Sequence, residues 1–238
     1  MMTTPIYIAL DLATWAETKQ FIDKNKLHGL PVKVGMELFY REGPSVIDKL
    51  KENNHPIFLD LKLHDIPTTV KRAMRNIASL EVDMVNIHAL GGREMIAAAK
   101  EGLMQGAGTH STPSLVAVTI LTSVTDDILG DELGLNGNVK RQAVRLASLA
   151  QEGGADGVVC SAYEAADIKM TCGQPFITVT PGIRLASTSH HDQKRVMTPS
   201  DARENKADIL VMGRSITTSD EPLRAYDYAK KEWERATY

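Results

Sequence analysis

Short runs of apolar and β-branched residues recur along the chain, and each is followed by a segment with helical spacing of its apolar positions. Eight such runs are nearly continuous rather than alternating, which is typical of strands in a parallel sheet covered by helices. The predicted strands are residues 6–10, 32–35, 57–61, 84–88, 115–120, 157–160, 176–179 and 209–212. Eight strand–helix units without a linker or low-complexity break predict an α/β fold, a single-domain (β/α)8 TIM barrel over residues 1–238.

The segments between these runs carry residues that begin and end helices. Ser161 and Glu164 have the spacing of a capping box. Asn138 is the predicted N-cap of a helix over residues 139–151, and the last helix is predicted to begin near Pro222. These signals place helices between the predicted strands, as the barrel requires.

A doubly wound open sheet is the alternative arrangement of alternating strands and helices. That fold binds dinucleotides at a glycine fingerprint directly after its first strand. The sequence LDLAT, residues 10–14, occupies this turn and contains no glycine. The first turn therefore favours the barrel.

Composition and charge exclude several classes of protein. With 238 residues, 43% apolar and 24% charged, the chain is unlike a disordered one and is long enough for a sizeable core. The net charge is −3, and no basic run or aromatic-basic stripe predicts a nucleic-acid partner. The only cysteines, Cys160 and Cys172, are expected to be reduced thiols. Without a signal peptide or an apolar run near the ~20 residues of a membrane span, the protein is expected to be soluble and cytoplasmic.

Ionisable residues gather where the predicted strands end. In barrel enzymes, the active site is built from the C-terminal ends of the strands. Asp11 follows the first strand, Lys33 lies in the second, and Asp60, Lys62 and Asp65 lie at or just beyond the end of the third. Because neighbouring parallel strands lie about 4.8 Å apart, we expect Lys33 to lie between Asp11 and Asp60. The result is an array of charges with alternating sign.

The spacing of Asp60 and Lys62 places both side chains on one face of a regular strand, roughly 6.6 Å apart. Leu59, Leu61 and Leu63 then lie on the opposite face, against the helices. One interpretation of the array is an ion-pair network that only holds the barrel together. Such networks add little net stability after desolvation, so a position at the functional face favours a catalytic array.

A second candidate site follows the last two predicted strands. The sequence TPGIR ends at Arg184 after the seventh strand, and Gly213 and Arg214 follow the eighth. The loops after these two strands form a phosphate site in many barrels. Glycine lets backbone N–H groups approach an anion, and arginine offers a forked pair of donors. The sequence therefore predicts phosphate binding here.

Residues 185–194, LASTSHHDQK, are polar and lack periodicity. Long irregular segments in compact domains are often lids, so we expect a lid between the seventh and eighth strands. His190 and His191 lack a suitably spaced third ligand, and no metal site is predicted.

The stretch DLKLHDIP, residues 60–67, resembles the signature of the orotidine 5′-phosphate decarboxylase family of bacterial type. The similarity continues in order along the chain through ALD, KVG, LTS, TPGIR and GR. The DxKxxD pattern alone is shared with a wider barrel superfamily, whereas the full string with its flanking matches is more specific. Thr68 and Ser215 depart from the common DIPNT and GRPIT, but neither change removes a charge or a backbone donor, so we expect small effects.

The resemblance implies decarboxylation of orotidine 5′-monophosphate to uridine 5′-monophosphate, the last step of de novo pyrimidine synthesis, without a cofactor. It implies that Lys62 is the proton donor and that Asp60, Lys33 and Asp65 complete a charged tetrad. The implied substrate contacts are Asp11 and Lys33 at the ribose hydroxyls, Thr122 and Ser123 at the pyrimidine, Gln193, Gly213 and Arg214 at the phosphate, and Arg184 near the lid, with Asp60 as a further substrate-binding residue. It also implies a homodimer in which Asp65 and Thr69 reach into the partner's site.

The implied chemistry suits these residues. Loss of CO₂ from C6 of the pyrimidine leaves negative charge that the ring cannot delocalise, and an ammonium at that carbon can stabilise the charge and then protonate it. One alternative is another DxKxxD barrel, a keto-sugar-phosphate decarboxylase or hexulose-phosphate synthase, whose motif acids bind a divalent metal. Another is a non-catalytic sensor of a phosphorylated metabolite. Lys33, Gln193 and the Ile-Pro after Asp65 favour the nucleotide decarboxylase.

Overall fold

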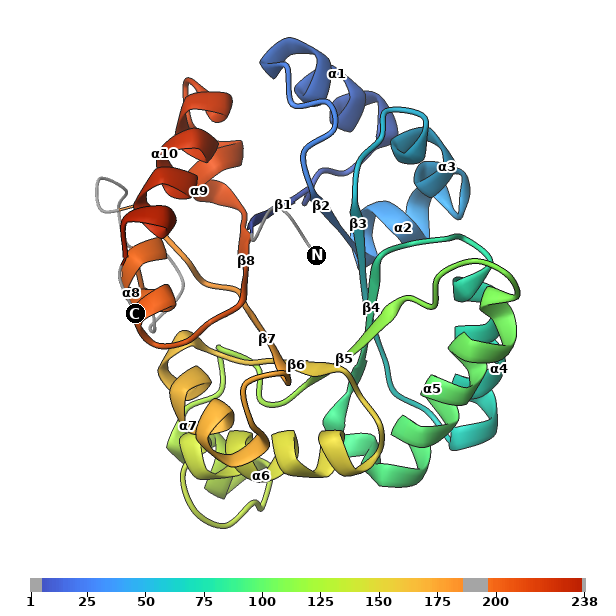
Figure 1. The fold of residues 1–238 in the computed structure, drawn as a ribbon, viewed down its shortest axis with the longest axis vertical. Coiled ribbons are helices and arrows are strands. Elements are labelled where there is room, and N and C mark those ends of the chain that lie inside the picture. Colours follow the sequence, from blue (N-terminus) through green and yellow to red (C-terminus); the bar gives the residue numbers. More distant parts are fainter. Residues whose placement is uncertain (1–5, 186–196, 237–238) are drawn as a thin grey trace.

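Eight parallel strands form a closed barrel with helices around it in a computed structural model that describes residues 6–185 and 197–236 (Figure 1). The strands are β1 (Ile6–Ala9), β2 (Val32–Gly35), β3 (Ile57–Leu63), β4 (Met84–His88), β5 (Ser114–Val118), β6 (Gly157–Val159), β7 (Ile177–Thr180) and β8 (Ile209–Met212). Because β1 pairs in parallel with β8, placing Ile8 opposite Met212, the sheet closes on itself. The predicted barrel is confirmed, and the open doubly wound sheet is excluded.

Helices follow the strands and form the outer layer of the barrel (Figure 1). They are α1 (Trp15–Asn25), α2 (Met36–Glu42), α3 (Ser45–Lys51), α4 (Pro67–Ala78), α5 (Gly92–Ala107), α6 (Val139–Glu152), α7 (Ala162–Cys172), α8 (Pro199–Glu204), α9 (Arg214–Thr217) and α10 (Pro222–Arg235). The predicted caps are confirmed, since Asn138 accepts the N–H of Arg141 and Ser161 forms a capping box with Glu164. Within the two described ranges, none of these helices has the length and hydropathy needed to cross a membrane.

The strand boundaries were predicted well where the apolar run and the hydrogen-bonded ladder coincide. β2, β4 and β8 begin and end as predicted, β1 and β6 each end one residue early, and β7 is displaced by one residue at both ends. The prediction was wrong for β5, which ends at Val118, because Ile120 is buried beyond the end of the ladder. It was also wrong for β3, which continues to Leu63 through an irregularity in its pairing with β4. Hydrophobicity indicates which residues are buried rather than which residues form a strand. Burial extends past the end of β5, whereas β3 continues beyond its last buried residue.

The interior of the barrel is filled by side chains, so a ligand can only bind at its mouth. Tyr7 and Phe58 meet edge to face inside the barrel with ring centroids 6.2 Å apart. Met84 and Val116 pack with them in this inner cluster. Leu59 and the other outward-facing residues of the strands belong instead to the layer between sheet and helices. This arrangement is typical of a packed barrel core.

Aspartates at the N-terminal ends of the strands tie neighbouring strands together. One such aspartate directly precedes each of β4, β6 and β8. Its carboxylate accepts a backbone N–H near the start of the strand that comes earlier in the chain, which is β3, β5 or β7. The pairs are Asp83 with Ile57 at 2.6 Å, Asp156 with Leu115 at 2.7 Å and Asp208 with Thr178 at 2.7 Å. A charged acceptor strengthens each hydrogen bond. These contacts stabilise the face of the barrel opposite the predicted site.

Helices α4 and α5 pack at backbone distance through two glycines. A Cβ on Gly102 would lie 2.2 Å from the carbonyl oxygen of Lys71, and one on Gly106 would lie 2.1 Å from that of Arg75. Helix α4 begins at Pro67, directly after the charged segment of β3. The glycine contacts therefore hold in place the helix that follows the candidate active site.

This packing predicts that Gly102→Ala destabilises the protein although alanine is the better helix former. The added methyl group must push α4 away, and overpacking of this kind costs about 1–3 kcal/mol. The measurement is the free energy of unfolding in urea. Gly130→Ala is the matched control, because a Cβ there would meet no atom within 4 Å. Equal stability of the two variants would contradict the tight contact between α4 and α5.

Candidate active site

Four charged side chains form a chain of ion pairs at the C-terminal end of the barrel. The Lys33 Nζ lies 2.6 Å from Asp11 Oδ1 and 3.7 Å from Asp60 Oδ2. The Lys62 Nζ lies 2.6 Å from Asp60 Oδ1. The order Asp11, Lys33, Asp60, Lys62 is the one that the strand spacing predicts. Lys33 is the most buried of them, with 8% of its side chain exposed.

The charges around Asp60 keep its carboxylate ionised. Burial alone raises the pKa of Asp60, because it disfavours the charged form. The ammonium groups of Lys33 and Lys62 and the hydrogen bonds from Lys62 and Asn86 outweigh burial and hold this pKa below its ordinary value of 3.8. Asp60 therefore carries its negative charge at any pH near neutrality.

The backbone at Lys62 departs from regular strand geometry. Its φ is +54°, a left-handed conformation that costs a non-glycine residue on the order of 1–3 kcal/mol. The pairing of β3 with β4 shifts register here, because Leu59 lies opposite Val85 and Leu63 lies opposite Ile87. The expectation of a regular strand was therefore wrong at this residue. Asp60 and Lys62 nevertheless meet, through the bulge rather than through the simple two-residue repeat.

Asn86 in β4 contacts both residues and was missed by the sequence analysis. Its side chain is fully buried. Its Oδ1 accepts the backbone N–H of Lys62 at 2.7 Å, and its Nδ2 donates to Asp60 Oδ1 at 2.6 Å. The signal in the sequence was a polar amide in the middle of an otherwise apolar strand.

Gly35 at the end of β2 was also missed, although it follows Lys33 by two residues. A Cβ at this position would lie 3.1 Å from Lys33 Nζ and 3.4 Å from Asp11 Oδ1. The hydrogen side chain of glycine therefore leaves room for the ion pair. The signal was a glycine two residues from a lysine, on the same face of the strand.

A cavity of about 250 Å³ lies beside the ion pairs. Asp60 and Lys62 line it together with Thr122 and Ser123, which follow β5. Apolar side chains from β3, β5, β6 and β8 form other parts of the wall. The structure thus brings the charged and the hydroxyl-bearing residues of the predicted site to one mostly apolar cavity. Such a lining suits a flat ring with a few polar groups.

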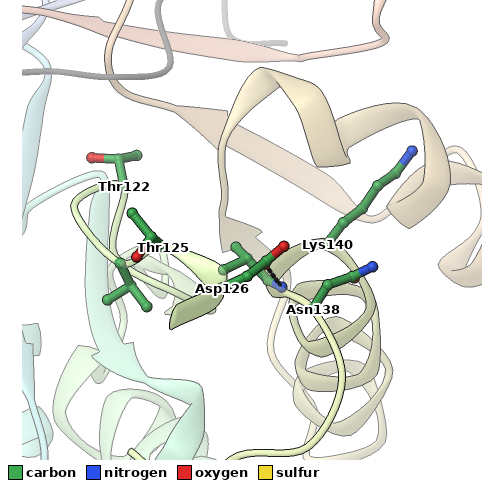
Figure 2. Close-up of a pocket in the computed structure, with 7 residues that line it drawn as sticks. Thr122, Thr125, Asp126, Asn138 and Lys140 are labelled. Atoms are coloured by element: carbon green, nitrogen blue, oxygen red, sulfur yellow. Dashed lines mark hydrogen bonds between the residues drawn. The ribbon is translucent and has the colours of Figure 1, made fainter. Parts of the chain in front are cut away.

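A second cavity of about 350 Å³ shares Thr122 with the first and extends towards the start of α6 (Figure 2). Several of its polar groups form contacts within the protein. Asp126 Oδ1 accepts the N–H of Val139 at 2.7 Å, and Lys140 forms an ion pair with Asp167. The contact of Asp126 with Val139 braces the long connection between β5 and α6, which carries Thr122 and Ser123, whereas the Lys140 ion pair joins α6 to α7.

The predicted phosphate residues that the structure describes follow β7 and β8, and Gly213 lies next to the charged array. A Cβ on Gly213 would lie 3.8 Å from Asp11 Oδ2, so the end of β8 borders Asp11. Arg184 is buried, and its Nη1 donates to the Ile183 carbonyl oxygen at 3.1 Å. Arg214 is the first residue of α9. Gln193, with His190, His191 and most of the predicted lid, lies outside the described residues.

Asp65 stands apart from the ion pairs. It is exposed, and its Oδ1 accepts the N–H of Ile66 at 2.7 Å. Among the residues that the structure describes, it forms no ion pair with Lys33 or Lys62. Thr69, in the first turn of α4, is exposed as well. The structure therefore brings together four of the five charges predicted for the array and leaves Asp65 at the surface.

The two departures from the family pattern occupy different environments. Thr68 is exposed in the first turn of α4. Ser215 is buried, with its hydroxyl 3.5 Å from the Ile183 carbonyl oxygen. Neither side chain contacts the chain of ion pairs in the described part of the structure.

Comparison with known proteins gives relatives that match nearly the whole chain. A curated orotidine 5′-phosphate decarboxylase from Bacillus cytotoxicus is 49% identical over 237 residues, which cover 99% of this chain and 100% of the relative. The protein of the same name from Bacillus mycoides matches with equal identity and coverage.

Solved structures agree with the fold as well as with the sequence. The crystal structure of orotidine 5′-phosphate decarboxylase from Lactobacillus acidophilus has a TM-score of 0.87 and 41% identity, over 97% of this chain and 99% of that one. An uncharacterized conserved protein from Geobacillus kaustophilus has a TM-score of 0.85 and 43% identity, over 96% and 100% of the two chains. The sequence model of the orotidine 5′-phosphate decarboxylase / HUMPS family matches residues 4–229. The chain therefore belongs to the orotidine 5′-phosphate decarboxylase / HUMPS family.

Proposed function

We propose that this protein is a cofactor-independent carboxy-lyase that converts orotidine 5′-monophosphate to uridine 5′-monophosphate in pyrimidine biosynthesis. The observation that carries the proposal is the ammonium of Lys62, which lines a mostly apolar cavity and lies 2.6 Å from the ionised Asp60. The names of relatives that are 49% identical over the full chain support the same substrate.

In the proposed reaction, Lys62 acts on the carbon that loses CO₂. The bond between C6 and the carboxylate breaks, and its electron pair stays on C6. The ammonium stabilises this charge and then transfers a proton to C6, while water returns a proton to the lysine. Asp60 holds Lys62 in position and faces the departing carboxylate, and Lys33 balances the charge of Asp60. We further propose that Asp65 completes this group from the partner subunit.

The proposed substrate contacts extend on both sides of these charges. Thr122 and Ser123 line the cavity with Lys62, which supports their assignment to the pyrimidine. Asp11 and Lys33 form the adjoining ion pair and are assigned to the ribose hydroxyls, and Asp60 beside them is a further substrate contact.

Phosphate binding is assigned to the ends of β7 and β8. Gly213 borders Asp11 there and Arg214 follows it as the first residue of α9, and Arg184 is assigned to the lid side of the phosphate together with Gln193. Contacts with a phosphate remote from C6 can supply binding energy that organises the charges for reaction.

The charges around Asp60 favour the decarboxylase over a metal-dependent member of the superfamily. Lys62 and Asn86 bind Asp60 Oδ1, and Lys33 lies 3.7 Å from Oδ2. Two ammonium groups at one carboxylate repel a divalent cation, because like charges at this separation interact strongly in a partly buried site. Asp60 is therefore better placed to orient a lysine than to bind a metal.

The proposal predicts that the purified protein decarboxylates orotidine 5′-monophosphate without an added cofactor. The substrate's ultraviolet absorbance should fall at the same rate with and without EDTA. Lys62→Ala should lower kcat by at least about 10²-fold, because it removes the proton donor. Lys19→Ala, which removes an exposed lysine of α1, is the matched control. Binding of uridine 5′-monophosphate without turnover would favour a sensor, and loss of activity in EDTA would favour a metal-dependent enzyme.

Gly35 gives a second prediction about the same site. In Gly35→Ala, the new methyl group crowds Lys33 Nζ and should displace it from Asp11. We expect kcat/KM to fall by about 10–10²-fold, the effect of misplacing a positioning group by up to 1 Å. Gly130→Ala again controls for the mutation itself. Wild-type kcat/KM in Gly35→Ala would show that the spacing between these two residues is not needed.

The proposed homodimer rests on the exposed segment after β3. Asp65 is exposed and unconnected to the lysines, and Ile66 beside it is 67% exposed. Leu90, after β4, is 47% exposed. An interface that covered both side chains would remove their apolar surface from water. We propose that Asp65 and Thr69 of each subunit enter the partner's site.

Mixing two inactive variants tests this arrangement. Lys62→Ala and Asp65→Ala would each lack activity alone, but a mixed dimer would contain one intact site and one doubly substituted site. After subunit exchange at equal concentrations, we expect about one quarter of wild-type activity, because half of the dimers are mixed and half of their sites are intact. Native mass spectrometry measures the exchange. Mixed dimers without activity would show that each site uses Asp65 from its own chain.

A further inference from the structure

We propose that Asn86 is a positioning residue that fixes Lys62 in its left-handed conformation and directs its ammonium towards the reacting carbon. The inference rests on the proposed function of Lys62 as the proton donor. Asn86 is fully buried in β4 and contacts the Lys62 backbone and the Asp60 carboxylate at once. It therefore acts on the site through its neighbours.

The bulge in β3 explains why such a residue is needed. Between Leu59 and Leu63, β3 advances four residues while β4 advances two, from Val85 to Ile87. The regular ladder is interrupted there, so a carbonyl of β4 does not pair with the N–H of Lys62. The Asn86 side chain takes the place of that carbonyl at 2.7 Å. A buried backbone donor without a partner is unfavourable, and the asparagine removes that penalty only while the bulge is present.

The amide is the chemical group that satisfies both contacts. A backbone N–H can only donate, and an ionised carboxylate can only accept, so the bridging side chain needs one acceptor and one donor. These requirements also fix which end of the amide faces each partner. An aspartate here would place a second carboxylate against Asp60, and an aliphatic residue would satisfy neither group.

Asn86 also aligns Asp60 with Lys62. Oδ1 of Asp60 receives hydrogen bonds from both Asn86 Nδ2 and Lys62 Nζ, each at 2.6 Å. The carboxylate therefore cannot rotate without breaking one of the two bonds. The same side chain thus restrains Lys62 at its backbone and, through Asp60, at its ammonium.

Two substitutions of Asn86 separate its contacts. Asn86→Ala removes both, and we expect kcat to fall by about 10²-fold with little change in KM, as for a misplaced catalytic group. Asn86→Asp is isosteric and keeps the acceptor for Lys62, but it adds a carboxylate beside Asp60. The like charge raises carboxylate pKa values, so the acidic limb of the kcat profile should move to higher pH by at least about one unit. Among the described residues, the ionisable groups around Asp60 include Lys33, Lys62 and His88 and, one contact further out, Asp11 and His64, all of which both variants retain.

Val85→Ala is the matched control. Val85 neighbours Asn86 in the same strand, is fully buried and packs in the layer towards the helices. Its truncation should lower the urea midpoint but preserve kcat and the pH profile. Equal losses of kcat in Asn86→Ala and Val85→Ala, or a loss confined to KM, would overturn the proposal.

A crystal structure of Asn86→Ala provides a readout that does not depend on activity. We expect Lys62 to leave the left-handed region and its Nζ to move away from Asp60. An unchanged bulge, with Lys62 at positive φ, would overturn the proposal whatever the kinetics. A wild-type protein that is inactive on orotidine 5′-monophosphate, combined with a displaced Lys62 in the variant, would instead sink the proposed function and leave the role of Asn86 standing.

Discussion

The arrangement of this site depends on one buried cation. The ammonium of Lys33 lies in the barrel wall with 8% of its side chain exposed, and it requires negative charge beside it. Asp11 and Asp60 supply that charge from the strands on either side, because parallel strands place their C-terminal ends at one level. The ammonium of Lys33 helps to keep Asp60 ionised and in place, and the carboxylate of Asp60 in turn forms an ion pair with Lys62. A change at Lys33 would therefore reach Lys62 through Asp60.

Stability alone does not account for these ion pairs. A buried pair gains in attraction roughly what it loses in hydration, and apolar residues of similar size often serve a core as well or better. The inner cluster around Tyr7 and Phe58 shows that this barrel fills its interior with such residues elsewhere. The charges occur instead at the mouth, beside a cavity of about 250 Å³. A chemical role explains the position of these charges better than a structural role does.

The sequence predicted the parts of the site that follow from strand periodicity and strand order. Lys33 lies between Asp11 and Asp60 because each sits near the end of a recognisable apolar run. The bulge at Lys62 was not predictable in this way, since it arises from the register of β3 against β4 and leaves no local pattern. Asn86 was not predicted for the same reason. Within its own strand it is one polar residue among apolar ones, and its role depends on its contacts with the neighbouring strand β3. The distance of Asp65 from the lysines likewise depends on where the chain turns after β3.

The strain at Lys62 is tolerable because the elements around it are held independently. The carboxylates of Asp83, Asp156 and Asp208 bind backbone N–H groups of neighbouring strands at the face opposite the candidate site. Close packing at Gly102 fixes α4 directly beyond the bulge. A left-handed lysine persists only when its surroundings leave it no easier conformation, and here both flanks of the segment are anchored. The contacts at the opposite face that stabilise the barrel therefore lie apart from the strained segment. As a result, the mouth of the barrel can hold Lys62 in a backbone conformation that an isolated strand would not adopt.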